Sequence, residues 1–65
     1  MSQLTAAQLQ KLLHENELHL QSDEKDIAMM ESVGAPESIV RVARNRLWVN
    51  RETNASLRSL IAEIE

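Results

Sequence analysis

The stretch Val33-Gly34-Ala35-Pro36-Glu37 decides the fold of this chain, because it holds the only glycine and the only proline among the 65 residues. Both residue types interrupt regular secondary structure, and here they stand two positions apart near the middle of the sequence. Gly34 suits the left-handed conformation that follows a helix, and Pro36 suits the first turn of the next helix. The stretch therefore predicts a turn over residues 33–36 with one helix on each side.

The residues before the turn have the pattern of one long helix, over about residues 5–33. Thr5 and Gln8 have the spacing of a capping box, which marks the start of a helix. From Leu9 to Met30, apolar residues recur at helical spacing. A break near Ser22 is the alternative, because a serine followed by two acidic residues is also typical of a helix start.

The residues after the turn predict a second helix of similar length, over about residues 36–64. Its stripe begins at Ile39, Val42 and Ala43 and continues to Ile64. Two helices of matched length joined by a short turn pack as an antiparallel hairpin. We therefore expect one all-α domain over residues 1–65. The predicted hairpin core consists of Leu9, Leu13, Leu20, Ile27, Ile39, Leu57, Leu60 and Ile61.

Folding the chain at the turn predicts the register of the two helices. Residue i should lie beside about residue 70 − i in such a hairpin. This register places Asp23 near Arg46 and Asn16 near Thr53 and Asn54. A polar layer of this kind lowers stability but penalises shifted registers. The alternative is that Asn16 and Arg46 point past the seam into water.

Size and composition limit what a single hairpin can achieve. A chain of 65 residues buries only about 60% of the surface that its unfolded form exposes. Disulfides and thiolate zinc sites are excluded by the absence of cysteine, so oligomerisation is the remaining ordinary means of stabilisation. The net charge is −4 over residues 1–33 and +1 over residues 34–65. This asymmetry favours association of the two halves.

The segment RVARNRLWVNR, residues 41–51, holds four arginines and the only aromatic residue of the chain, Trp48. Trp48 falls opposite the apolar stripe of its helix, and the predicted register sets Leu18 level with it. Tryptophan and arginine are enriched among the residues that dominate protein interfaces. We therefore expect a homodimer built as a four-helix bundle. The predicted protein interface consists of Trp48, Arg41, Arg44, Arg51 and Leu18.

Residues 30–46 support an alternative, because their turn resembles that of helix-turn-helix DNA-binding proteins. The resemblance implies a recognition helix in which Ser38, Arg41 and Arg44 contact DNA. Met30 departs from the small residue usual where the two helices cross, and Glu37 would face phosphate. The sequence pI of about 5.3 also favours a protein partner over nucleic acid.

The chain carries no recognisable catalytic or metal-binding motif. His14 and His19 are five positions apart, so their imidazoles point to different sides of a helix. We therefore expect no enzymatic activity, no cofactor and no metal. No apolar run approaches the roughly 20 residues of a membrane helix, and the first residues lack the features of a signal peptide. The sequence therefore predicts a cytoplasmic protein without a membrane span.

The sequence begins with MSQLTAAQLQKLL (residues 1–13) and ends with NASLRSLIAEIE (residues 54–65). In these two segments the chain resembles the small all-helical proteins encoded in the early regions of lambda-like bacteriophages. The resemblance implies a protein of the host cytoplasm that binds a host or phage protein and alters host growth or phage development. The predicted function is thus that of a non-enzymatic protein-binding or regulatory protein.

Overall fold

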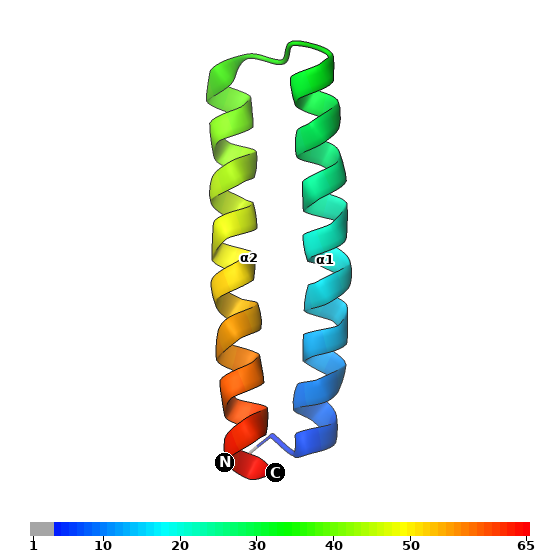
Figure 1. Cartoon of the computed structure of the whole chain (residues 1–65), viewed down its shortest axis with the longest axis vertical. Coiled ribbons are helices and arrows are strands. Elements are labelled where there is room, and N and C mark those ends of the chain that lie inside the picture. The colour runs from blue at the N-terminus through cyan, green and yellow to red at the C-terminus, as the bar shows by residue number, and fades with distance from the viewer. Residues whose placement is uncertain (1–3) are drawn as a thin grey trace.

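A computed structural model describes residues 4–65, which form two long helices joined by a short turn (Figure 1). Helix α1 spans Ala6–Ser32 with 27 residues, and α2 spans Glu37–Ile64 with 28 residues. The helices lie side by side and antiparallel, in a molecule of 45 × 19 × 16 Å. The predicted all-α hairpin is confirmed. The alternative break near Ser22 is wrong, because α1 continues through this position.

The first helix begins and ends with two well-formed caps. At its start, the Gln8 backbone N–H donates to the Thr5 hydroxyl at 3.2 Å, and the Thr5 backbone N–H donates to the Gln8 side chain at 2.8 Å. At its end, Gly34 has a φ of +70°, which a residue with a Cβ rarely adopts. The N–H of Ala35 then donates to the Met30 carbonyl at 2.9 Å, as in a Schellman motif. The predicted capping box and turn glycine are confirmed.

The proline lies one position earlier in the second helix than predicted. Pro36 is the N-cap of α2 rather than a residue of its first turn. Its carbonyl accepts hydrogen bonds from the backbone N–H groups of Ile39 and Val40 at 3.0 and 3.2 Å. Since proline has no N–H of its own, nothing is left unsatisfied at this position.

The two helices meet along a narrow seam whose residues alternate at spacings of three and four, as in a coiled coil. The only buried apolar side chains of the described residues are Leu9, Ile27, Val40 and Ile61. Half-buried residues and one buried asparagine fill the positions between them. The seam consists of Leu9, Leu13, Asn16, Leu20, Asp23, Ile27 and Met30 from α1, and Val40, Ala43, Leu47, Asn50, Asn54, Leu57 and Ile61 from α2.

Two members of the predicted core lie outside this seam. Ile39 is 51% exposed and Leu60 is 46% exposed. Each directly precedes a buried residue, Val40 or Ile61, and one step along an α-helix rotates a side chain by about 100°. The prediction had combined two neighbouring apolar stripes of α2, only one of which faces α1. The other predicted core residues, Leu9, Leu13, Leu20, Ile27, Leu57 and Ile61, all lie in the seam.

The helix ends define the register. Ser32 and Glu37 flank the turn, and Ala6 lies level with Ile64 at the other end (Figure 1), so residue i of α1 lies beside about residue 70 − i of α2, as the sequence predicts. The ion pairs Glu17–Arg58, Glu24–Arg51 and Glu31–Arg44 join residues whose numbers add up to 75, because side chains lean toward the N-terminus of their helix and long side chains from different levels meet. Asp23 accepts a hydrogen bond from Asn50 at 2.7 Å and forms no ion pair with Arg46 in the described residues.

Candidate interaction surface

One edge of the hairpin is closed by ion pairs that link the two helices. We call it the charged edge, and its members each follow a seam residue by one position. Their nitrogen–oxygen distances are 3.3 Å for Arg58 and Glu17, 3.4 Å for Arg51 and Glu24, and 3.1 Å for Arg44 and Glu31. Because these side chains are solvent-exposed, each pair contributes at most about 1 kcal/mol. The charged edge consists of Glu17, Glu24, Glu31, Arg44, Arg51 and Arg58.

Two of the arginines that the sequence assigned to a protein interface belong to this edge. Arg51 holds Glu24, and Arg44 lies within 3.5 Å of Glu37 in addition to Glu31. Their charges are therefore directed at carboxylates of their own chain. Arg41 makes no ion pair within the part of the chain that the structure describes, and it is exposed.

Trp48 and Leu18 do not form a common contact surface. Both side chains are exposed, Trp48 at 61% and Leu18 at 52%. With the register given by the helix ends, Leu18 lies level with about residue 52, roughly 6 Å from Trp48 along the hairpin at about 1.5 Å per residue. Their heights are thus similar, as predicted. Leu18, however, follows the seam residue Asn16 by two positions and projects away from α2, so the two side chains lie on different faces of the hairpin.

The opposite edge of the hairpin carries a stripe of exposed aliphatic side chains. Its members on α2 precede seam residues by one position, so they project on the side away from the charged edge. Val42 is the most exposed of them at 63%. We call this surface the open face. Its apolar members are Ile39, Val42, Val49 and Leu60 of α2 and Leu12 of α1.

The polar residues within the open face interrupt its apolar character only in part. The hydroxyl of Thr53 donates to the Val49 carbonyl at 3.0 Å, so this residue can be covered without leaving a donor unpaired. Arg46 has no ion pair within residues 4–65. It is the one positive charge on the α2 part of this face.

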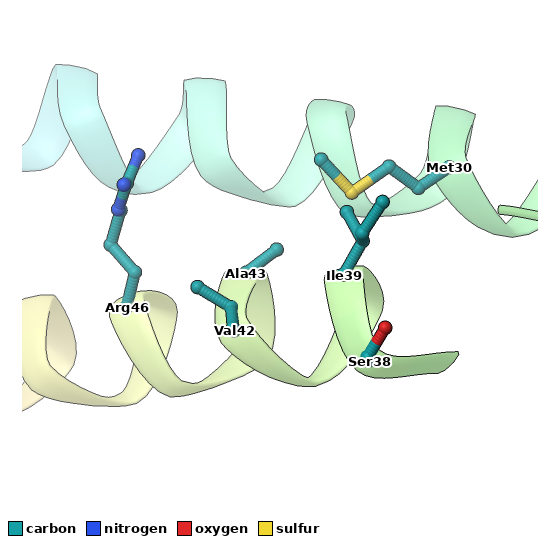
Figure 2. A pocket seen from close by; sticks show the side chains of 6 residues that line it. All are labelled: Met30, Ser38, Ile39, Val42, Ala43 and Arg46. Atoms are coloured by element: carbon teal, nitrogen blue, oxygen red, sulfur yellow. The ribbon is translucent and has the colours of Figure 1, made fainter. Parts of the chain in front are cut away.

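A hollow of about 490 Å³ lies in the open face near the turn (Figure 2). Met30 enters it from α1, opposite Ile39, while the Arg46 side chain extends from α2 toward α1 at its far end. The walls are almost wholly apolar. A second hollow, of about 290 Å³, follows α1 at the other end of the hairpin. The first hollow is lined by Met30, Ser38, Ile39, Val42, Ala43 and Arg46, and the second by Leu4, Gln8, Lys11, Leu12 and Glu15.

The middle of the seam contains polar groups without complete hydrogen bonding. The Asn16 Oδ1 and the Asn54 Nδ2 are buried and have no partner. The Asn54 Oδ1, in contrast, accepts from the Arg58 Nε at 2.9 Å. Unpaired buried polar atoms cost free energy, so the hairpin is least stable on its own at this level.

Neither a metal site nor a membrane span is found in the described residues. His14 and His19 are both exposed, and no group of three potential ligands forms among residues 4–65. No helix in this part of the chain is long and apolar enough to cross a membrane.

The open face was not predicted as a separate surface. The signal was present, since Ile39, Val42, Val49 and Leu60 each stand one position before a residue of the seam. A second signal was the seven-residue spacing of Glu17, Glu24 and Glu31, matched by that of Arg44, Arg51 and Arg58. Charges at this spacing flank the seam of a coiled coil and fix which stripe faces inward.

Comparisons of the chain with protein-family models, with curated proteins and with solved structures found no match. The interpretation of the open face therefore depends on its own geometry and chemistry.

Proposed function

We propose that this chain is a non-enzymatic protein-binding module of a regulatory kind, and that it works as a homodimer in which two hairpins form a four-helix bundle. The observation that carries the proposal is the open face. Its exposed aliphatic residues outnumber the four buried ones of the seam. A coiled-coil-like stripe that faces no helix of its own chain is suited to pack against helices of a partner.

The exposed area supports a partner of this size. The chain exposes 5155 Å², whereas a folded monomer of 7.4 kDa is expected to expose about 4,200 Å². The excess is close to the roughly 800 Å² that each partner buries in an interface of standard size. One further hairpin on the open face would therefore reduce the exposed area of the chain to about that of a folded monomer of the same mass.

Trp48 and Arg41 stay in water in this arrangement, because they lie away from the open face. They belong to the interface that the sequence predicts, and they are available for a further protein. The resemblance to early phage proteins would make that partner a host or phage protein. The dimer would then present the same contact twice.

The proposal is tested by placing a charge on the open face. In Val49→Lys, two copies cannot pair without burying an ammonium group, so we expect the dissociation constant of the dimer to rise about a hundredfold or more. The measurement is the molar mass by light scattering over a dilution series. Helix content is followed by circular dichroism at the same concentrations.

Leu18→Lys is the matched control, because Leu18 has a similar exposure and lies outside the open face. We expect this variant to keep the mass of the unmodified protein. A monomeric mass for the unmodified protein, or an equal loss of mass in both variants, would contradict the proposal. Trp48→Ala is the third variant. If it alone lowered the molar mass of the assembly, the interface would lie on the outer side of α2 and not on the open face.

The DNA-binding alternative gains no support from the geometry. Its recognition helix would need to cross the preceding helix steeply, whereas α1 and α2 lie side by side and antiparallel (Figure 1). Of its three proposed contacts, Ser38 lines the apolar hollow and Arg44 pairs with two carboxylates.

A further inference from the structure

The two ends of the open face differ in shape. Near the turn, the face is hollowed between Met30 and the small side chains of Val42 and Ala43 (Figure 2). At the other end, Leu60 projects from α2 and is 46% exposed, while the smaller second hollow follows α1 beside Leu12. Along α2, the end near the turn thus borders the larger hollow, and the other end carries a projecting leucine.

Two copies can cover each other's open face in a parallel or an antiparallel orientation. In a parallel pair, the hollow of one copy meets the hollow of the other, and the space between them stays unfilled. Protein interiors are close-packed, and unfilled apolar space is destabilising. In an antiparallel pair, the Leu60 end of each copy meets the hollow of the other. The shapes of the open face therefore favour the antiparallel orientation.

The charge of Arg46 favours the same orientation. A parallel pair sets the two Arg46 side chains at the same level, where like charges repel within a contact that excludes water. An antiparallel pair centred on the stripe separates them by roughly 15 Å, at about 1.5 Å per residue. It also brings Arg46 toward the level of Glu15 in the second copy. Glu15 has no ion pair within residues 4–65.

We infer that the occupant of the open face is a second copy of this chain, docked antiparallel with α2 against α2 and with a two-fold axis crossing near residues 49–53. This inference rests on the proposed function, because it specifies the partner and orientation at the same surface. In this dimer Val42 lies opposite Leu60 of the second copy, and the charged edges and Trp48 remain outside.

Single-cysteine variants test the orientation cleanly, because the chain has no cysteine of its own. Val42→Cys and Leu60→Cys are oxidised under mild conditions, each alone and as an equimolar mixture in which one variant carries a mass tag. In the antiparallel dimer, two Val42 positions lie roughly 27 Å apart at about 1.5 Å per residue. A disulfide needs Cα atoms within about 7 Å. We therefore expect cross-linked heterodimer from the mixture and almost none from either variant alone.

Rapid cross-linking of Val42→Cys on its own would overturn the inference in favour of a parallel dimer, while the proposed function would stand. Absence of any cross-link, in samples whose mass is dimeric, would overturn it by placing the contact elsewhere. A monomeric mass before oxidation would instead be a failure of the proposed function. Circular dichroism of both variants verifies that the helices are formed.

Discussion

The charged edge and the open face flank the same seam, yet they have opposite chemistry. On the charged edge, three glutamates of α1 meet three arginines of α2 at 3.1–3.4 Å. On the open face, α2 presents Ile39, Val42 and Val49, and α1 leaves each of them at least 47% exposed. One edge is completed within the hairpin and the other is not.

This difference arises because the two helices carry different apolar surfaces. α1 has one narrow seam stripe and polar residues around most of its remaining surface. α2 has two adjacent stripes, one facing α1 and one facing outward. In helical bundles a broad apolar surface of this kind contacts more than one neighbour. The asymmetry between the edges follows from the composition of α2.

The largest effect should come from the seam that both edges share. Leu9 is 3% exposed, and its replacement by alanine removes buried contacts and leaves a cavity. We expect Leu9→Ala to lower the free energy of unfolding by about 2–5 kcal/mol, measured by urea denaturation at fixed protein concentration. Leu18→Ala is the control, and its effect should stay within about 0.5 kcal/mol. Equal effects in the two variants would contradict the assignment of the seam.

A change of opposite sign is expected in the polar middle of the seam. The Asn16 Oδ1 is buried without a partner, so Asn16→Leu should raise the free energy of unfolding by about 1–3 kcal/mol. Thermal and urea denaturation measure this gain. Asn54→Leu provides the comparison, because it also removes the hydrogen bond from Arg58 and should gain less. Destabilisation by Asn16→Leu would mean that a second copy or water satisfies this amide.

The smallest effect is expected on the charged edge. Arg51→Ala removes one exposed ion pair and should lower the free energy of unfolding by no more than about 1 kcal/mol. The loss should shrink as salt is added, because exposed charges are screened. Urea denaturation at low and high salt measures both effects. A loss of several kcal/mol that salt leaves unchanged would show that this edge is buried against a partner.

The elements determined by local sequence were predictable. The capping box at Thr5 and the turn at Gly34 depend on residues within one helical turn of each other, and their geometry leaves little choice. The seam of α1 was also predictable, because its apolar residues form a single stripe. These features together predict the hairpin.

The seam of α2 depends on contacts between distant residues, and there the prediction was wrong for Ile39 and Leu60, which do not face α1. Periodicity cannot choose between Ile39 and Val40, or between Leu60 and Ile61, because both stripes have the same spacing. The ion pairs decide which stripe faces α1. Glu24 and Arg51 can meet only if the stripe with Val40, Leu47 and Ile61 faces inward. The interface was likewise assigned to Trp48 because of its residue type, while the apolar stripe beside the seam was counted as core.

The most direct test of the open face as an interface is sedimentation equilibrium of the unmodified chain over a wide range of concentrations. The account predicts a mass near twice 7.4 kDa that falls on dilution, together with a loss of helix content. Both changes are expected because the hairpin alone buries only four apolar side chains among residues 4–65. A mass of one chain with full helix content at every concentration would contradict it, since the open face would then be stable in water.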